Sequence, residues 1–517
     1  MAAARTTPTG DRPPRSTDRV LAVVSPRSKG PTSLFDAPSP ITQQNVGQYT
    51  SDRDVLQAAA RELTQIGFEV LNIGDATISI AGRPEQFESV FGAKLERQHM
   101  ERSASKDSVD YFRSAEGPES YMLPPDRLSG IIEGVAIAEP PDYYEAALPP
   151  LVEAAANTYR YLFVPNEIGM LLNAERIHRM GTTGKGVPVA MIDSGHYAHT
   201  FFNRYGFRVS PTVLGPGSSD PSNDMSGHGT GESANIFATA PDATLIPIKM
   251  AADSTGAFNA AIAQNPKVIS CSWGYNIDQP GATLSAYLKT LEAAVALAVS
   301  KGITVVFAAG NGHFSFPASH PDVLAVGGVH VNYPALTFEA SSYASSFNSS
   351  LYPGRAVPDV CGLVGKNVGG TAPLVMLPVQ PGASLDTGNT GSGTDGWGIF
   401  SGTSAACPQV AGIVALLIQK KPTLQPKDVK KILVDSAIDV KAGSTAMGHA
   451  AGNGPDLATG AGLANAKWAW LITMGGLTAE FFSAAPEIQH TMVNEGTMPP
   501  LTQELINEMI STLRSRV

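Results

Sequence analysis

The first hundred residues alternate between short apolar runs and stretches with apolar side chains three and four residues apart. The first pattern is typical of strands and the second of amphipathic helices. Ser51 and Gly67 bracket the longer helical stretch as an N-cap and a C-terminal stop. In chain order the pattern predicts a strand at 20–24, a helix over 52–66, strands at 68–72 and 77–80, a helix over 84–91 and a strand at 93–97. This βαββαβ order is the ferredoxin-like arrangement of an α+β unit.

A proline-rich join separates this unit from the rest of the chain. It reads Glu-Pro-Pro-Asp-Tyr-Tyr-Glu-Ala-Ala-Leu-Pro-Pro over residues 139–150, a composition typical of a linker. The end of the chain carries Leu505, Met509 and Leu513 at four-residue spacing, which predicts a helix packed against the body. The predicted division is a flexible N-terminus (1–18), the N-terminal unit (19–138), a linker (139–160), a main body (161–475) and a tail with a helix (476–517).

Two apolar runs of the body end in polar residues. Residues 187–192 lead into Asp193 and a turn, and residues 303–309 lead into Asn311 between two glycines. These residues are therefore expected at the carboxyl ends of buried strands, where open α/β sheets gather their sites. An asparagine amide there can stabilise a developing oxyanion, although asparagine is also an ordinary turn residue.

A third segment places a serine at the start of an apolar helix. A Ser-Gly-Thr turn leads to Ser404, and apolar residues follow at helical spacing as far as Leu417. The positive end of the helix dipole stabilises an alkoxide and a later oxyanion, which suits a nucleophile. Pro408 fits the first turn, because an N–H there has no partner within the helix. A simple capping serine would show the same pattern.

A fourth segment, Ser-Gly-His-Gly-Thr-Gly at residues 226–231, opens another helix with His228. Asp193, His228 and Ser404 together supply a carboxylate, a base and a nucleophile in the chain order found in subtilisin. The four segments resemble those of the subtilisin-like serine peptidases, over roughly residues 160–475. The stretches at 240–249 and 426–433 also match that family.

The resemblance implies a doubly wound parallel α/β fold and a hydrolase that cuts polypeptides without a cofactor for the chemistry. Asp193, His228 and Ser404 fall on the family's triad motifs, and Asn311 falls on its oxyanion-hole asparagine. It also implies a substrate-binding strand, to which the substrate backbone adds as another strand. The residues implied in substrate binding are Ser272, Trp273, Gly274, Ala309 and Gly310. We expect Trp273 and the loop at 312–316 to shape the side-chain pockets.

The N-terminal unit resembles the activation prodomain of these peptidases, and residues 81–92 look closest to the sedolisin type. The expected product is thus a zymogen whose own prodomain inhibits it and whose linker is cut by autoprocessing. A generic binding module is the alternative, since the ferredoxin-like fold hosts many functions.

Departures from the family pattern keep other functions open. Glu232 lies one helical turn after His228, where a valine is more usual, and sedolisins use a glutamate as base. We expect His228 to be the base and Glu232 to lie at the surface or to support the site from behind. The alternatives are a sedolisin-like acid peptidase that uses Glu232, a transpeptidase, and a non-catalytic binding scaffold.

Composition fits a water-soluble enzyme. The net charge of −10 argues against binding to nucleic acid or to an anionic membrane, and no apolar stretch is long enough to span a bilayer. The polar, basic N-terminus lacks the apolar core of a signal peptide, so we expect synthesis in the cytoplasm, with signal-independent export still open. The three cysteines form no framework, so we expect buried thiols. Access of thiol reagents to Cys271 and Cys407 is the alternative, because both lie beside the expected site.

One metal site is a candidate. Asp439 and the Gly-Asn-Gly-Pro-Asp stretch that ends at Asp456 are similar to the C-terminal calcium loop of sedolisins. Carboxylates and backbone carbonyls of a glycine loop suit a hard cation. Ordinary subtilisin-like peptidases lack that site, and residues 459–466 match them equally well.

Overall fold

The structure is a computed structural model. It describes residues 6–8, 19–101, 108–143, 161–332, 335–366, 374–386, 394–400 and 402–475. The expected tail helix, most of the linker and most of the N-terminal eighteen residues lie outside these ranges. Within the described ranges, no helix is both long and apolar enough to cross a membrane.

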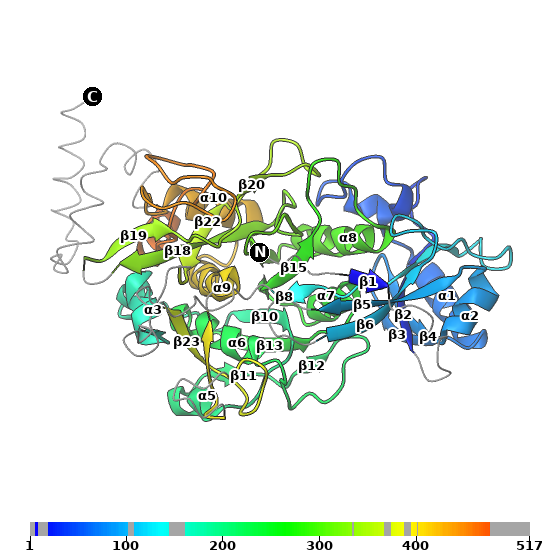
Figure 1. The fold of residues 1–517 in the computed structure, drawn as a ribbon, viewed down its shortest axis with the longest axis horizontal. Coiled ribbons are helices and arrows are strands. Elements are labelled where there is room, and N and C mark those ends of the chain that lie inside the picture. Colours follow the sequence, from blue (N-terminus) through cyan, green and yellow to red (C-terminus); the bar gives the residue numbers. More distant parts are fainter. Residues whose placement is uncertain are drawn as a thin grey trace.

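One large sheet forms the centre of the body (Figure 1). Its path is β11-β13-β10-β14-β16-β18-β19, with β12 beside β13 and β22 beside β18. All neighbours are parallel except β18 and β19, so the predicted doubly wound α/β fold is confirmed. The strands are β10 (Pro188–Asp193), β11 (Arg208–Val209), β12 (Val213–Leu214), β13 (Thr244–Lys249), β14 (Val268–Cys271), β16 (Thr304–Ala308), β18 (Leu324–Asn332), β19 (Thr337–Ala340) and β22 (Val360–Leu363).

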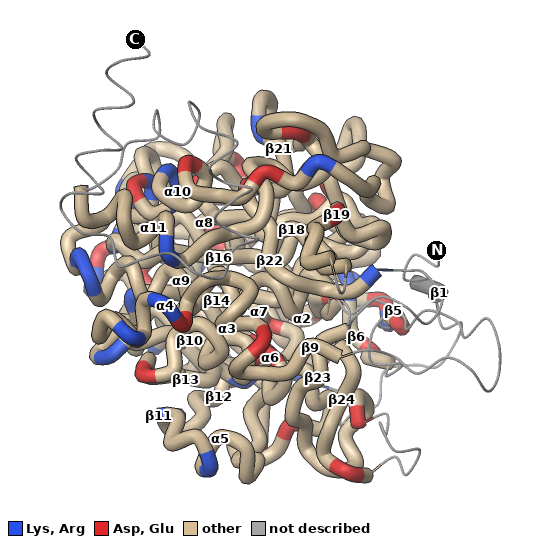
Figure 2. The backbone as a smooth tube through the Cα atoms, turned by 90° about the vertical axis from the view of Figure 1, so that its left-hand side faces the viewer, with Lys and Arg blue, Asp and Glu red and all other residues tan. Residues whose placement is uncertain are grey.

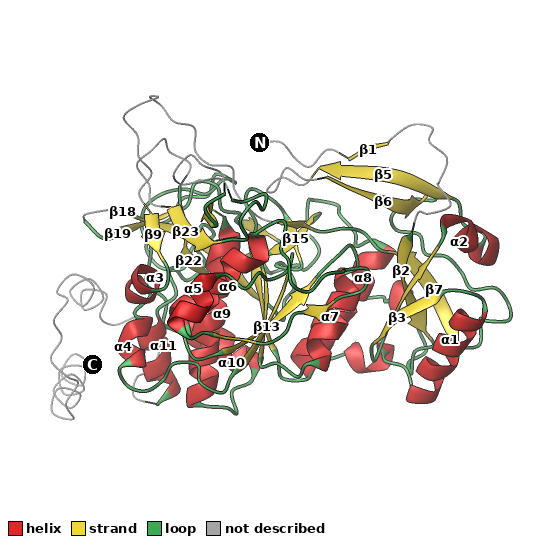
Figure 3. Ribbon diagram, turned by 90° about the horizontal axis from the view of Figure 1, so that it is seen from below, coloured by secondary structure: helices red, strands yellow, loops and turns green. Residues whose placement is uncertain are grey.

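Helices cover both faces of this sheet (Figure 3). Alternate side chains of β10 point to opposite faces, as the period of a strand requires. Val189 and Met191 join the core formed with α6 and α9, whereas Ala190 and Ile192 join the core formed with α7 and α8. These helices are α6 (His228–Thr239), α7 (Ser254–Ala263), α8 (Ala286–Ser300) and α9 (Thr403–Lys420).

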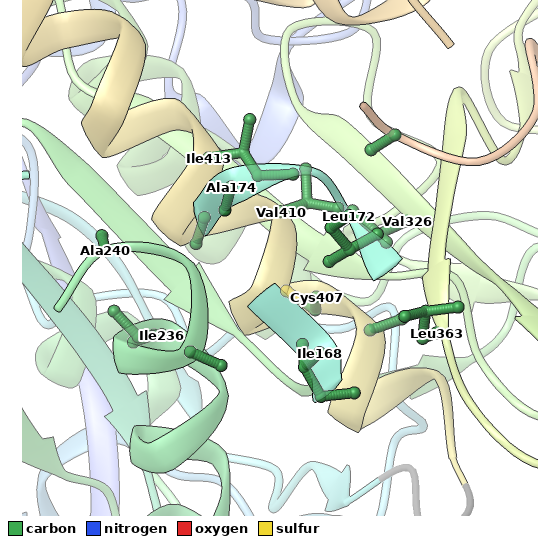
Figure 4. Close-up of a cluster of buried hydrophobic side chains, with 14 of the residues drawn as sticks. Ile168, Leu172, Ala174, Ile236, Ala240, Val326, Leu363, Cys407, Val410 and Ile413 are labelled. Carbon is green, nitrogen blue, oxygen red and sulfur yellow. The ribbon is translucent and has the colours of Figure 1, made fainter. Parts of the chain in front are cut away.

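Close packing fixes the position of α9. A Cβ atom at Gly412 would lie only 2.0 Å from the hydroxyl of Thr239, so glycine is needed where α9 crosses α6. Around this crossing Ile236 of α6 and Val410 of α9 meet apolar side chains from four other segments (Figure 4). The start of α9 is therefore set by a dense core. The surrounding helices are α3 (Asn166–Leu171), α4 (Ala174–His178), α10 (Pro426–Asp435) and α11 (Ala466–Thr473).

The N-terminal unit forms a four-stranded antiparallel sheet in the order β3-β4-β2-β7. This is the ferredoxin-like strand order, but its fourth strand is not the predicted stretch at 93–97. That stretch belongs to β5, which leaves the sheet and pairs with β6 and β1 (Figure 3). The almost continuously apolar β7 takes the place beside β2, which suits a buried position better than the charged β5 does. The elements are β1 (Thr6–Pro8), β2 (Val20–Pro26), α1 (Arg53–Gln65), β3 (Glu69–Ile73), β4 (Ile78–Gly82), α2 (Pro84–Phe91), β5 (Leu95–Glu101), β6 (Ser108–Ser114) and β7 (Ile132–Ile137).

The N-terminal unit docks on α7 and α8 of the body. Two short 3-10 helices, η1 (Leu34–Asp36) and η2 (Val46–Tyr49), pack on α8. Hydrogen bonds also join the two parts. The N–H of Gln43 donates to Oδ2 of Asp322 at 2.7 Å, and Nδ2 of Asn259 donates to Oγ1 of Thr77 at 2.9 Å. The hydroxyl of Tyr275 donates to the carbonyl of Glu139 at 2.9 Å. We call this surface the docking face.

Smaller elements complete the fold. They are β8 (Asp142–Tyr143), β9 (Tyr161–Phe163), α5 (Thr200–Tyr205), β15 (Trp273–Asn276), β17 (Ser315–Phe316), β20 (Phe347–Asn348), β21 (Ala356–Val357), β23 (Leu374–Pro378) and β24 (Trp397–Phe400). Acidic and basic residues are interspersed along the backbone (Figure 2).

Candidate active site

Asp193, His228 and Ser404 come together at the carboxyl edge of the central sheet. Asp193 is the last residue of β10, His228 is the first residue of α6, and Ser404 is the second residue of α9. All three side chains are fully buried. The sequence pattern predicted that Asp193 lies at this edge. The fold brings the first turns of α6 and α9, with His228 and Ser404, to the same edge.

The imidazole of His228 is held by Asp193. Its Nδ1 lies 2.8 Å from Oδ1 of Asp193, and that oxygen also accepts the N–H of Ser194 at 2.7 Å. An ionised carboxylate only accepts hydrogen bonds, so Nδ1 carries the proton in this pair. The other nitrogen, Nε2, is then the basic one.

Asp224 connects the turn after β10 to the start of α6, a role that the sequence analysis missed. Its carboxylate accepts the N–H of Gly227 (3.0 Å), the N–H of Thr230 (2.8 Å) and the hydroxyl of Ser194 (2.8 Å). A buried acceptor at a helix N-terminus satisfies backbone donors and complements the dipole. The signal was an aspartate four residues before His228, within a run of Asp, Ser and Asn residues that reads as an ordinary loop.

Ser404 is anchored against the next strand. Its hydroxyl donates to the carbonyl of Ser272 at 3.0 Å, and the hydroxyl of Ser272 donates to the carbonyl of Ser404 at 2.9 Å. This reciprocal pair joins the first turn of α9 to the residue that precedes β15. The nucleophile candidate therefore lies directly beside the predicted substrate-binding strand.

Asn311 lies in a turn whose neighbours Gly310 and Gly312 both have positive φ angles, of 104° and 80°. Such angles are rare for other residues, which explains the two glycines. The side-chain oxygen Oδ1 of Asn311 accepts hydrogen bonds from the backbone N–H of Thr403 at 2.9 Å and from the hydroxyl of Thr403 at 3.2 Å. The amide is thus fixed next to Ser404, with its NH₂ group on the side away from Thr403.

A segment of the linker occupies the predicted substrate strand. The short strand β8 pairs antiparallel with β15, with Tyr143 opposite Trp273 and Asp142 opposite Gly274, while β17 pairs with the other side. The buried ring of Tyr143 lies against the imidazole of His228, with 5.1 Å between the ring centroids. The sequence analysis treated these residues only as linker. Two adjacent tyrosines in a proline-rich stretch were the available signal.

Trp273 does not shape a side-chain pocket, contrary to our expectation. Its ring is fully buried, donates from Nε1 to the carbonyl of Ile192 at 2.7 Å and packs edge-on against Phe307. Successive side chains of a strand point to opposite faces. At Trp273 the backbone pairs with β8 and the side chain points into the core. Its contribution to the cleft is its backbone.

Ala309 and Gly310 lie between β16 and Asn311. The N–H of Ala309 donates to the carbonyl of Val326 at 2.9 Å, and the N–H of Gly310 donates to the hydroxyl of Thr403 at 3.1 Å. A Cβ atom on Gly310 would lie 2.9 Å from the hydroxyl of Ser345, so the backbone approaches its neighbours closely there. These contacts hold the Asn311 turn against α9.

Glu232 is not at the surface. It is fully buried, and its Oε1 lies 3.9 Å from Nε2 of His228. Cys271 and Cys407 are free thiols buried in the core, as expected, and the alternative of access to thiol reagents is not supported. Burial raises the pKa of Cys407 to about 12 and that of Cys271 well above its usual value. The core helices next to the site therefore carry more buried polar groups than the sequence suggested.

The candidate calcium ligands do not fit a cation. Asp456 accepts the N–H groups of Gly452 (2.7 Å) and Thr459 (2.8 Å), and Asp439 accepts the N–H of Gly454 (3.0 Å). Lys441 also lies 3.8 Å from Asp439. In the described ranges, no three His, Cys, Asp or Glu side chains are grouped so that they could hold a metal ion. These carboxylates instead accept hydrogen bonds from backbone N–H groups of the loop.

Comparisons with known proteins show the family and the fold. A model described as the Subtilase family matches residues 184–462. Subtilisin E of Bacillus subtilis (strain 168) is 32% identical over 292 residues, which cover 52% of this chain and 64% of that protein. Subtilisin of Bacillus pumilus is 32% identical over 292 residues, which cover 52% of this chain and 89% of that protein.

A solved structure is also similar in fold. Fervidolysin from Fervidobacterium pennivorans, described as a keratinolytic enzyme related to subtilisin, matches with a TM-score of 0.53 and 16% sequence identity. The match covers 88% of this chain and 62% of that one. This chain thus matches less than two thirds of the length of both fervidolysin and Subtilisin E.

Proposed function

Because this chain belongs to the subtilase family, we propose that it is a serine endopeptidase made as a zymogen. The observation that carries the proposal is the convergence of Asp193, His228, Ser404 and Asn311 beside β15, with a segment of the chain already paired to that strand. The substrate is a polypeptide that adds to β15 as β8 does.

In the proposed reaction, Ser404 Oγ attacks the carbonyl carbon of the scissile peptide bond. The Ser404 proton passes to Nε2 of His228, while Asp193 holds Nδ1 and stabilises the resulting imidazolium. The N–H of Ser404 and the NH₂ group of Asn311 bind the oxyanion. His228 then gives its proton to the leaving amine, and water releases the acyl group by the reverse sequence.

The N-terminal unit is proposed as the inhibitory prodomain. It covers the docking face and continues into β8, which occupies the substrate strand and brings Tyr143 against His228. Since β8 is antiparallel to β15, the chain direction leads from Tyr143 towards Ser272 and its partner Ser404. We therefore place the activating cut within about three residues after Tyr143. The sequence likeness of residues 81–92 to the sedolisin type supports a prodomain of that kind.

Mass spectrometry of the purified chain after incubation tests this function. The parent should yield a cut between residues 143 and 146, and the Ser404→Ala chain should stay at full length. A fluorophosphonate probe should label only Ser404 in the processed protein. Labelling at another residue, or an uncut parent that is fully active, would overturn the proposal.

A further inference from the structure

Glu232 is a buried carboxylate next to the catalytic base. It lies on α6 four residues after His228, so both side chains project from the same face of the helix. Its Oε1 is 3.9 Å from Nε2 of His228, and its side chain has no exposed surface. Nε2 is the nitrogen that must accept the proton of Ser404. Helical spacing placed Glu232 one turn after His228, and the structure adds that its carboxylate is buried beside the ring.

A chain of amides holds the other oxygen of Glu232. Asn235 donates from Nδ2 to Oε2 of Glu232 at 2.9 Å, and Gln409 of α9 donates from Nε2 to Oδ1 of Asn235 at 3.3 Å. Gln409 is itself fixed by both backbone groups of Leu363, at 2.8 and 2.9 Å. The orientation of Glu232 is therefore built into the contact between α6, α9 and β22, and Oε1 is directed to His228.

Several other titratable groups of the described residues lie near this pair. Buried His196 contacts α6 at Ser233, and burial lowers its pKa to about 4. From β10 comes Asp193 at Nδ1 of His228, and Tyr143 of β8 lies against the ring. Cys407 of α9 and Cys271 of β14 are thiols whose raised pKa values keep them neutral. Asp224, before α6, is occupied by backbone and hydroxyl donors. The Glu232 carboxylate therefore lies close enough to Nε2 of His228 to stabilise an imidazolium there.

We propose that Glu232 is a positioning residue of the peptidase that acts through His228, as a second carboxylate on the Nε2 side of the ring. This role of Glu232 rests on the proposed function, because His228 is the base of that reaction. When Nε2 takes the proton of Ser404, the cation forms between Asp193 on one side and Glu232 on the other. A buried carboxylate this close favours the protonated ring. Glu232 strengthens His228 as a base and sets the pH below which the enzyme becomes inactive.

The first test is the pH profile of kcat/KM for the processed Glu232→Gln enzyme. The acid limb should move to lower pH by about 1–3 units, the range for a carboxylate this close to a titrating group. At the plateau, kcat should fall on the order of ten-fold with KM unchanged, since the interaction is made with the cation and not with the substrate. A profile that superimposes on that of the parent overturns the proposal.

Glu339→Gln is the matched control. Glu339 of β19 lies 3.6 Å from Nε2 of His330, a second carboxylate–histidine pair outside the site. The same substitution there should leave the acid limb of activity in place. A shift in this control equal to that of Glu232→Gln would show that the effect is general and would overturn the assignment.

The second test does not depend on activity. In the full-length Ser404→Ala chain, the imidazole signal of His228, assigned by its loss in the His228→Ala chain, is titrated by NMR. Adding Glu232→Gln should lower the titration midpoint of His228 by at least about one pH unit. An unchanged midpoint overturns the proposal even if the peptidase assignment holds. A shifted midpoint supports it even if the chain proves inactive.

Glu232→Asp covers the case in which Glu232→Gln fails to fold. The shorter side chain keeps the charge but withdraws it from Nε2, so the His228 midpoint should fall below that of the parent. A midpoint that rises or stays unchanged would overturn the proposal.

Discussion

The carboxyl edge of the central sheet, where Asp193, His228 and Ser404 lie, and the docking face of this protein use polar groups in opposite ways. At this edge, three fully buried side chains come from three separate segments. His228 is hydrogen-bonded to Asp193, and Ser404 is hydrogen-bonded to the carbonyl of Ser272. On the docking face, hydrogen bonds such as Gln43 to Asp322 and Asn259 to Thr77 are spread over two helices and the loops beside them. In the proposed function each group at the edge contributes to one reaction. Each contact of the docking face contributes a small part of the free energy of docking.

This difference predicts how the two regions respond to change. Removing one group at the edge should abolish or greatly reduce turnover, because the groups act as a unit. Removing one contact of the docking face should change inhibition only slightly, because the remaining surface holds. The predictions below test this contrast, from the largest expected effect to the smallest.

Ser404→Ala should lower peptidase turnover by roughly 10⁶, the scale for losing the nucleophile of such a triad. The fold should survive, since the change removes one oxygen and the hydrogen bond of that oxygen to Ser272. Turnover is measured with a fluorogenic peptide, and circular dichroism checks the fold. Activity close to that of the parent in a folded Ser404→Ala protein would show that another residue is the nucleophile.

Asn311→Leu should lower kcat by about 10²–10³ and leave KM nearly unchanged, because the amide is needed once the oxyanion forms. Part of the loss has a second cause, since Asn311 also accepts two hydrogen bonds from Thr403. Asn311→Asp separates the two, because it keeps the acceptor and removes the donor. If Asn311→Asp turns over as fast as the parent, the donor of the oxyanion hole lies elsewhere.

The positions of the residues at the carboxyl edge were largely predictable from the sequence, because they sit in short motifs at element ends. Asp193 closes an apolar run, and Ser404 opens an apolar helix, so local patterns placed both. The burial of Glu232 could not be predicted, since it depends on Asn235 and on Gln409, which lies 174 residues after Asn235 on another helix. Helical spacing showed that Glu232 faces the same way as His228, but not what covers that face.

The N-terminal unit shows the same limit. Periodicity found both of its helices and three strands of its sheet. It misplaced the fourth strand, because residues 93–97 and 132–137 are both compatible with a strand and only tertiary packing decides which one joins β2. The occupation of β15 by β8 was likewise invisible, since a two-residue strand carries no periodic signal.

Docking should weaken as the pH rises, through two carboxyl groups buried under the N-terminal unit. Burial raises the pKa of Glu292 to about 7 and that of Asp253 to about 6, where Ile41 and Ser79 of the N-terminal unit contact them. Exposed carboxyls titrate near pH 4, so the docked state holds more protons between about pH 4 and 7. Docking is then strongest below this window and is lost progressively as the pH rises through it.

Dissociation of the two parts can be measured directly. A cleavage site for an external protease is inserted in the linker of the Ser404→Ala chain, the linker is cut, and the separation of the parts is followed by analytical ultracentrifugation. Docking should be roughly 10–100-fold weaker at pH 8 than at pH 5. Glu292→Gln should remove much of this difference. Equal docking at both pH values would show that these carboxyls remain buried when the N-terminal unit leaves.

The smallest effect is expected for a single polar contact of the docking face. Asp322 accepts the backbone N–H of Gln43 at 2.7 Å, at a partly exposed site, and its other carboxylate oxygen is 3.5 Å from Nε2 of Gln43, too long to add much. Losing one such bond costs about 1 kcal/mol, so Asp322→Ala should weaken docking about five-fold in the same ultracentrifugation assay. Asp435→Ala is the control, because the carboxylate of Asp435 pairs with Lys431 on its own helix α10. A loss of docking of 10³-fold or more in Asp322→Ala would mean that this face, like the carboxyl edge, depends on a few dominant groups.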